Sequence, residues 1–357
     1  MLYLLRTRVR EKNMRPTIKD IAKKAGVSHT TVSRALNGNP TISSETVARI
    51  KSIAKELGYL GSATARGLKT NRSQVIGVIV SRIDNPYFGE IIQGIEETIN
   101  NRDYSLVIAS SHRDPSKEKM IIHAFARQMV DGVIICTSSF SEENAAIISQ
   151  YEIPCVVVNN ETPERYDQSL QHDDLSAGCL IARYLLQLGH RRLAYIGDSL
   201  AVRINNERQQ GFIDELNRNE KNIEPQIIIH SQGREIENGE EAMIRLLRVK
   251  PHPTAVFCFN DLMAIGAIKT IKDHHLRVPE DISVVGFDNI PFSAYISPAL
   301  TTFDQPKFRM GQEAAELLLH EFESPHKHNP NFIRHKNILG KLLVRESASA
   351  PLKRISS

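Results

Sequence analysis

The feature that most constrains the fold is a series of short, unbroken apolar runs that begins at residue 75. Helical patterns near residues 87–101, 115–129 and 175–188 separate some of these runs. Strands without polar alternation are buried on both faces, as in parallel sheets that helices cover. The pattern therefore predicts an α/β fold, with strands at residues 75–80, 105–110, 131–136, 154–159, 192–197, 225–230, 254–259 and 281–288.

The number of strands predicts two lobes rather than one. About nine strands over roughly 270 residues are too many for one comfortable sheet, so two Rossmann-like lobes are expected. Lobes of this kind bind ligands at the carboxyl ends of their strands. Two facing lobes would therefore enclose a ligand in a cleft.

The N-terminal part of the chain follows a different pattern. Thr17 is expected to cap a first helix, which Gly26 ends by supplying a positive φ. Ser28 caps a second helix, and a third begins at Ser43 or the next residue and ends at Gly58. Two short helices joined by a glycine turn and supported by a third predict a helix-turn-helix.

Charge is distributed unevenly along the chain. Residues 1–73 hold 15 Lys and Arg against 4 Asp and Glu, whereas the remainder holds 30 and 37. A strongly basic segment on an acidic body favours a polyanion-binding module attached to another domain. A basic tail that only aids solubility is the alternative.

The polar face of the second predicted helix indicates which polyanion is bound. His29, Thr30 and Arg34 can reach base edges in a DNA major groove, where arginine is the natural partner of guanine. The other residues expected to contact DNA lie better for phosphates: Thr17, Ser28, Thr31, Ser33 and Asn37. A small helical bundle with a solvated face is the competing interpretation.

These motifs carry a family resemblance. The stretch "TIKDIAKKAGVSHTTVSRALNG" followed by "ISSETVARIKSIAKELGY" resembles the headpiece of the lactose/galactose repressor family. The resemblance continues through "NPYF", "DGVII", "GHRRLAYIG", "RQQGF", "FND" and "VVGFDNI", and covers about residues 16–345. It implies a periplasmic-binding-protein-like core crossed by three strands, a homodimer, a pseudo-palindromic DNA operator and a small-molecule effector.

The segment that follows the headpiece matches the hinge of this family. The resemblance implies a hinge helix at residues 61–73, in which Leu68 wedges into the minor groove beside Ala65 and Lys69. The chain departs from the family by having Gly61 and Ser62 where Pro-Asn is usual. That departure weakens the start of the helix, and a plain flexible linker is the alternative.

The resemblance also implies the residues that contact the effector. Aromatic side chains after the first strand suit the apolar face of a sugar or base. The arginine within "RQQGF" has a planar fork that can pair with two oxygens. The residues carried over are Tyr87, Phe88, Asp174, Arg208, Arg234, Asn260, Asp288 and Gln305.

One departure bears on the class of the effector. Arg234 stands where the family commonly has an aromatic residue, and with Arg208 it could place two guanidinium groups near the cleft. Such a pair favours an effector with an acidic group, such as a sugar acid or sugar phosphate. A neutral sugar is the alternative, with Arg234 facing solvent or pairing with Glu235 or Glu237.

The motifs of several enzyme classes are missing from the chain. It has no G-x-x-x-x-G-K-[ST] phosphate loop, no G-x-G-x-x-G fingerprint, no G-x-S-x-G elbow and no H-E-x-x-H. His326 and His328 lie among Pro and Lys in an expected loop rather than a metal site, and Asp173 and Asp174 lack an evident acid/base partner. We expect no enzyme activity, no cofactor and no metal.

The compartment follows from what the sequence lacks. The opening "MLYLLRTRVR" has its charges after a short apolar cluster, which is the reverse of a secretory signal, and no apolar run is long enough to span a membrane. The four cysteines form no C-x-x-C pair and are expected to be reduced. We expect a cytoplasmic protein with no membrane association.

The sequence thus predicts an effector-controlled, homodimeric DNA-binding regulator, most simply a repressor whose effector is a sugar or sugar derivative. Two alternatives stay open: a regulator controlled by a protein corepressor, and a cytoplasmic sugar-binding protein or enzyme on the same core. The expected domains are a disordered extension (1–15), the headpiece (16–60), the hinge (61–73), the two-lobed core (74–345) and a flexible tail (346–357).

Overall fold

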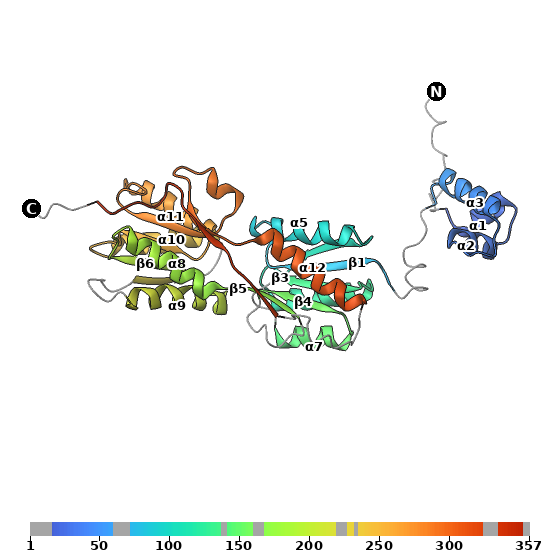
Figure 1. Cartoon of the computed structure of the whole chain (residues 1–357), viewed down its shortest axis with the longest axis horizontal. Helices are drawn as coiled ribbons and strands as arrows, with labels where there is room; N and C mark the ends of the chain where they lie inside the picture. The colour runs from blue at the N-terminus through green and yellow to red at the C-terminus, as the bar shows by residue number, and fades with distance from the viewer. Residues whose placement is uncertain are drawn as a thin grey trace, which may run out of the picture. The chain divides into compact units, whose positions relative to one another are not determined.

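The computed structural model describes residues 16–59, 72–136, 141–159, 168–218, 227–231, 235–323 and 335–352. The chain divides into two units, Met1–Ser73 and Gln74–Ser357, and each is described by itself (Figure 1). The expected N-terminal extension, most of the expected hinge and Arg234 lie outside the described residues.

The first unit is the three-helix arrangement that the sequence predicts. It comprises α1 (Ile18–Ala25), α2 (His29–Leu36) and α3 (Ser44–Glu56). The Asp20 carboxylate accepts hydrogen bonds from the backbone N–H and the hydroxyl of Thr17, and Gly26 has a φ of 66°. Ser28 Oγ accepts from the Thr31 N–H at 3.1 Å. Ile21, Val32 and Ile50 are fully buried between the helices and hold the unit together.

The first lobe of the second unit is built on a parallel six-stranded sheet. Its strands run in the order β11-β5-β4-β3-β1-β2. Two helices, α5 (Tyr87–Asn100) and α12 (Lys307–Glu323), pack on one face, and α6 (Pro115–Arg127) and α7 (Glu142–Gln150) pack on the other. The strands are β1 (Val75–Val80), β2 (Ser105–Ser110), β3 (Gly132–Cys136), β4 (Cys155–Val158), β5 (Ser169–His172) and β11 (His335–Ile338).

The second lobe has the same layers. Its six-stranded sheet runs β12-β10-β9-β8-β6-β7 and is parallel apart from β12, which pairs antiparallel with β10. The helices α8 (Asp174–Gln187) and α9 (Val202–Arg218) cover one face, and α10 (Glu235–Arg248) and α11 (Asp261–Asp273) cover the other. The remaining elements are β6 (Leu193–Asp198), β7 (Ile227–Ser231), β8 (Ala255–Cys258), β9 (Ser283–Asp288), the 3-10 helix η2 (Pro291–Ala294), β10 (Thr301–Asp304) and β12 (Lys341–Leu343).

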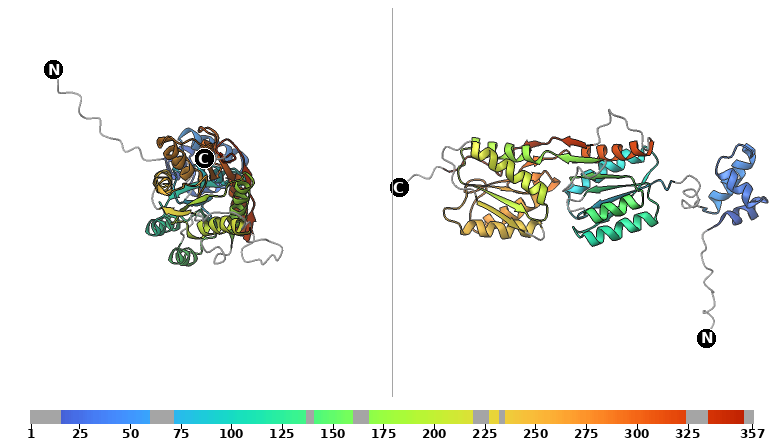
Figure 2. Two further views of the ribbon diagram at one scale, coloured as in Figure 1. Left: turned by 90° about the vertical axis from the view of Figure 1, so that its left-hand side faces the viewer. Right: turned by 90° about the horizontal axis from the view of Figure 1, so that it is seen from below.

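The chain passes between the lobes three times, from β5 to α8, from β10 to α12 and from β11 to β12. Figure 2 shows these crossings together along one side of the two lobes. Each lobe is therefore built from segments that are not continuous in sequence. The four short strands β5, β10, β11 and β12, which flank the crossings, lie outside the apolar runs that predict the others.

The end of the described chain corrects the expectation of a flexible tail from residue 346. Ser347 is fully buried, and its hydroxyl donates to the Val284 carbonyl at 2.6 Å and accepts from the Thr301 N–H at 2.8 Å. His190 Nε2 lies 2.9 Å from the Ser349 carbonyl oxygen. Residues 346–352 thus belong to the second lobe, held by polar contacts that leave no apolar pattern in the sequence.

The four cysteines are free thiols, of which Cys136, Cys179 and Cys258 are buried and Cys155 is half-buried. Along the described ranges, no helix has both the length and the apolar character needed to cross a membrane.

Candidate functional site

One face of α2 presents the polar side chains that the sequence assigns to DNA. His29, Thr30 and Arg34 are exposed, as a side chain that reads base edges must be. Asn37 donates from Nδ2 to the Ser33 carbonyl at 2.6 Å, so this amide also ends α2. Thr17 is exposed at the start of α1. The hinge residues expected to touch DNA, Ala65, Leu68 and Lys69, lie outside the described residues.

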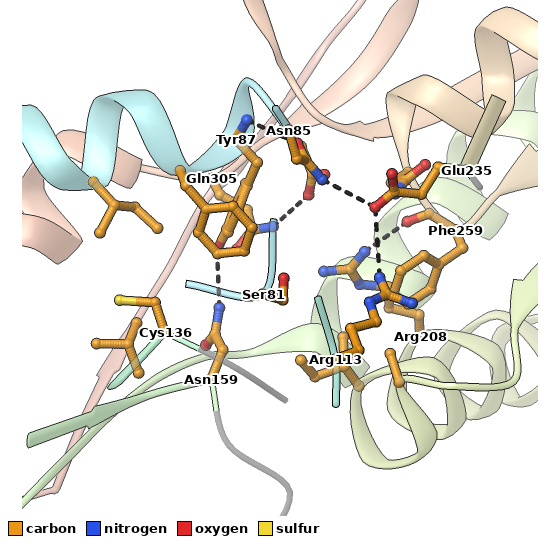
Figure 3. Close-up of a pocket in the computed structure, with 17 residues that line it drawn as sticks. Ser81, Asn85, Tyr87, Arg113, Cys136, Asn159, Arg208, Glu235, Phe259 and Gln305 are labelled. Carbon is orange, nitrogen blue, oxygen red and sulfur yellow. Dashed lines mark hydrogen bonds and ion pairs between the residues drawn. The ribbon is translucent and has the colours of Figure 1, made fainter. Parts of the chain in front are cut away.

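A pocket lies between the two lobes (Figure 3). Its lining includes residues at or just beyond the carboxyl ends of β1, β3, β4, β8 and β9, where α/β lobes are expected to bind ligands. The lining residues are Ser81, Asn85, Tyr87, Phe88, Ile91, Arg113, Cys136, Val158 and Asn159 from the first lobe, Ala201, Ile204, Arg208, Glu235, Phe259, Asn260 and Asp288 from the second, and Gln305 from a crossing.

Arg208 is a buried residue of the pocket lining and is held on several sides. Its Nε donates to Asp174 Oδ1 at 2.8 Å, and one terminal nitrogen donates to the Phe259 carbonyl at 2.6 Å. Its guanidinium carbon lies 3.6 Å from the ring centre of Phe287. Burial alone would raise the pKa of Asp174, but Arg208 and His172 outweigh that effect and lower it. The charge of Arg208 is therefore balanced within the protein.

Asp288 supplies a carboxylate at the end of β9. Burial raises its pKa to about 6, although Arg208 and Lys307 favour the charged form. Gln305 donates from Nε2 to Asp288 Oδ1 at 2.7 Å, which fixes the side chain. Near neutral pH this carboxylate is largely ionised and can accept hydrogen bonds from a ligand.

Tyr87 links the first lobe to a crossing. Its hydroxyl donates to Gln305 Oε1 at 3.2 Å and accepts from Asn159 Nδ2 at 3.0 Å. The ring of Phe88 stands edge-on to that of Tyr87 at 5.1 Å. Burial raises the pKa of Tyr87 well above its usual value, so the hydroxyl keeps its proton.

Beside the pocket, three charged side chains and the amide of Asn85 join the two lobes. Arg113 of the first lobe donates to Asp198 Oδ2 of the second at 2.6 Å and lies 3.5 Å from Glu235 Oε1. Asn85 donates to the same Glu235 oxygen at 3.1 Å. Burial raises the pKa of Glu235, and Arg113 opposes that shift. We call these four residues the inter-lobe clasp (Figure 3 labels three of them).

The comparisons with known proteins agree with this architecture. Residues 17–62 match the model of bacterial regulatory proteins of the lacI family, and residues 182–348 match a periplasmic binding protein-like domain. An HTH-type transcriptional repressor PurR from Photorhabdus laumondii is 39% identical over 305 residues, which cover 85% of this chain and 89% of the relative. The chain belongs to the lacI family of bacterial regulatory proteins.

Two solved structures of lacI-family proteins extend the comparison. The lac repressor dimer bound to operator and the anti-inducer ONPF has a TM-score of 0.80 and 27% identity, over 94% of this chain and all of that one. A regulator from Enterococcus faecium with bound ribose has a TM-score of 0.69 and 28% identity, over 77% of this chain and 99% of that one. Within the lacI family, this chain is a DNA-binding transcriptional repressor and not an enzyme.

Most of the effector residues expected from the family converge on one place. Tyr87, Phe88, Arg208, Asn260, Asp288 and Gln305 line the pocket. Asp174 lies behind Arg208, to which it is paired, and Arg234 lies outside the described residues. Asn260 has a second task, because its side chain accepts from the Met263 N–H at 2.9 Å and caps α11.

Sequence reasoning missed the inter-lobe clasp and several wall residues. Arg113 lies in the β2–α6 connection, and Glu235 opens α10. Their only sequence signal is a place shortly after a predicted strand, which many surface residues share. Asn159 and Phe259 carry a stronger signal, because each directly follows an apolar strand.

The pocket offers hydrogen bonds and aromatic faces rather than metal ligands. Among the described residues, no group of three or more His, Cys, Asp or Glu side chains could hold a metal ion. Burial raises the pKa of the pocket thiol, Cys136, to about 12, so it stays protonated and is a poor ligand or nucleophile.

Proposed function

We propose that this repressor binds a pseudo-palindromic operator as a homodimer and that a small effector in the pocket sets its affinity for DNA. The observation that carries the proposal is the lining of the pocket, to which both lobes contribute. A molecule that touches both lobes stabilises one closure angle over others. Such a preference shifts operator affinity through linkage, typically by ~1–3 kcal/mol.

In this proposal α2 reads the operator. His29, Thr30 and Arg34 contact base edges, and Thr17, Ser28, Thr31, Ser33 and Asn37 contact phosphates. Leu68, flanked by Ala65 and Lys69, wedges into the minor groove from the hinge at residues 61–73. The support is the exposure of the α2 residues and the likeness to a lac repressor dimer solved on its operator.

We infer that the effector is neutral, with a flat apolar face and several hydrogen-bonding groups. Tyr87 and Phe259 offer the aromatic surface, and Asp288 offers the acceptor. The main argument for an acidic effector is an unbalanced guanidinium charge in the cleft, and Asp174 already balances the charge of Arg208. A sugar, a sugar derivative or a base has this chemistry, and a lacI-family relative holds ribose.

Selection of bound DNA from a random pool tests the DNA part of the proposal. The full-length protein should enrich one pseudo-palindromic sequence, and Arg34→Ala should lose about 1–3 kcal/mol of discrimination between that sequence and random DNA. Lys51→Ala removes the same charge from an exposed position on α3 and is the matched control. If Arg34→Ala weakens binding to the selected sequence and to random DNA equally, Arg34 contacts only phosphates. If the protein enriches no sequence from the pool, the proposal is overturned.

Calorimetric titration tests the effector part. D-ribose, D-ribonate and adenine separate a neutral sugar, its acid and a base. Binding of a neutral compound that Asp288→Asn weakens at least tenfold, and that changes operator affinity, supports the proposal. If only D-ribonate binds tightly, the effector is acidic and this part of the proposal is wrong. If operator affinity changes only when another protein is added, control by a protein corepressor is favoured.

A further inference from the structure

Lys307 is a fully buried lysine at the crossing from β10 to α12. Its Nζ lies 2.5 Å from the Asp288 carbonyl oxygen, 3.2 Å from that of Asn289 and 3.4 Å from that of Gln305. An ammonium group has three protons, so three carbonyls can satisfy it completely. The first two carbonyls belong to the second lobe, and the third belongs to the crossing itself.

The position of Lys307 is costly for a cation. It is the first residue of α12, and the positive end of a helix dipole disfavours a positive charge there. Removal of the ammonium group from water is unfavourable in addition. Glu90 of α5 at 3.4 Å and Asp304 of β10 at 3.7 Å offset part of this cost. A methionine of similar size would avoid the cost, which indicates that the ammonium has a specific task.

The turn that Lys307 contacts is strained. Asp288 has a φ of 105° and Asn289 a φ of 52°, in two consecutive residues that are not glycine. A residue that is not glycine is strained in this region and persists there only where its surroundings enforce it. The strain has a visible result, because it brings the Asp288 side chain into the pocket, where Gln305 holds it.

We propose that Lys307 is a positioning residue: its ammonium clamps the carbonyls of the strained Asp288–Asn289 turn and so aims the Asp288 carboxylate at the effector. Lys307 does not line the pocket and acts only through Asp288. This role rests on the proposed function, because it takes the pocket to be the effector site. It also joins the turn of the second lobe to α5 of the first through Glu90.

The test measures the turn directly in the full-length protein without DNA or effector. The N–H of Asn289 donates to Thr302 Oγ1 at 3.3 Å, and that of Ile290 donates to Asp261 Oδ2 at 2.8 Å. In Lys307→Met, hydrogen exchange at these two amides should accelerate at least tenfold relative to the amides of β8. With ¹³C-carboxyl aspartate and Asp288→Asn for assignment, the Asp288 pKa should rise by about one pH unit.

Two variants make the result specific. Lys269→Met removes a charge from an exposed ion pair on α11 and should leave both readouts unchanged. Lys307→Arg keeps the charge but cannot place its planar donors on the same three carbonyls, so exchange at the turn should accelerate while the pKa of Asp288 stays near its starting value.

Uniform acceleration across the lobe, or unchanged exchange at the turn in both Lys307 variants, would overturn the positioning role. If Lys307→Met fails to fold, exchange in Lys307→Arg decides alone. None of these readouts depends on operator binding, so a failure here leaves the proposed function standing. Conversely, a failure of operator selection leaves the clamp intact.

Discussion

At the scale of single residues, Arg208 differs from what its place in the family predicts. The resemblance implies an arginine that grips the effector, but two of its nitrogens are committed to Asp174 and to the Phe259 carbonyl. Its guanidinium carbon also lies 3.6 Å from the ring centre of Phe287 and 4.6 Å from that of Phe259, which leaves mainly the second terminal nitrogen for a ligand. Its pairing with Asp174 therefore fixes the orientation of the guanidinium in the pocket.

We predict that Asp174→Asn lowers the free energy of unfolding of the core by about 3–5 kcal/mol, because the buried guanidinium loses its counter-charge. Urea denaturation followed by far-ultraviolet circular dichroism measures the loss. Asp281→Asn breaks an ion pair with Arg277, which is largely exposed, and should cost less than about 1 kcal/mol. Equal effects of the two variants would contradict the prediction.

The candidate site could be predicted only in part at this scale. Tyr87, Asp288 and Gln305 follow from motifs that the family shares, and the structure brings them together in one pocket. Arg113 and Glu235 could not be predicted, because their partners are more than a hundred residues away or lie in the other lobe. Pairing across a cleft leaves no pattern within either segment.

At the scale of elements, three helix pairs pack so closely that glycine is required in each helix. A Cβ on Gly178 of α8 would lie 2.2 Å from the Arg208 carbonyl oxygen, and one on Gly211 of α9 would lie 1.9 Å from that of Leu175. The pairs α5–α12 and α10–α11 repeat this arrangement at Gly94, Gly311, Gly239 and Gly266. Gly178 thus lets α8 pack directly against the backbone of Arg208, the pocket arginine.

Gly211→Ala should therefore separate α8 from α9 and lower the free energy of unfolding by about 1–3 kcal/mol. Gly89→Ala is the matched control, because a Cβ there meets open space and the helix propensity of alanine should stabilise by about 0.5–1 kcal/mol. Urea denaturation of both variants gives opposite signs if the close approach is real. A stabilised Gly211→Ala protein would refute it.

The contact between His190 and the C-terminal segment gives a second prediction at this scale. Burial lowers the pKa of His190 to about 4, although its contact with the Ser349 carbonyl opposes the shift. His190 is thus neutral in the folded state at a pH where the unfolded chain is already protonated. Above about pH 6.5 both states are neutral at this position, and the free energy of unfolding has its full value. As the pH falls from 6.5 towards 4, the unfolded chain binds a proton that the folded state does not, so the free energy of unfolding decreases.

Replacement by a residue that does not titrate should remove that dependence. His190→Gln is expected to be less stable at pH 7.5 and to lose less stability than the starting protein between pH 6.5 and 4. Chemical denaturation at several pH values measures both slopes. Identical slopes would mean that His190 makes no contribution.

Elements could be predicted from sequence where apolar runs are long. Each of the eight apolar runs corresponds to a strand of four to six residues. The sequence does not predict β5, β10, β11 and β12, because these strands are short and rich in Thr, Gln, His and Lys. Strands of this kind owe their conformation to neighbours that are distant in sequence. Residues 346–352 were misjudged for the same reason.

At the scale of the whole core, the inter-lobe clasp should hold the cleft closed. Arg113→Gln removes the charge that joins the first lobe to Asp198 and Glu235 of the second. Spin labels at the exposed Met120 of α6 and Ile244 of α10 report the separation of the lobes. We expect a longer mean distance and a broader distribution in Arg113→Gln, with Arg277→Gln as the matched surface control.

The double variant Asp198→Asn, Glu235→Gln should give the same opening, and its combination with Arg113→Gln should add nothing further. Additive effects would mean that Arg113 and the two carboxylates act separately. An unchanged distance distribution in all variants would show that other contacts fix the closure.

The three crossings have a mechanical consequence. Two bodies joined at a single point can swing and twist freely, but three connections set side by side remove most of these motions and leave rotation about one axis. The main motion left to the lobes is then a change in the angle between them. An occupant of the cleft would then act mainly by changing that angle. Under the proposed function, pocket residues can therefore change to recognise a new molecule while the resulting change in angle, which controls DNA binding, stays of the same kind.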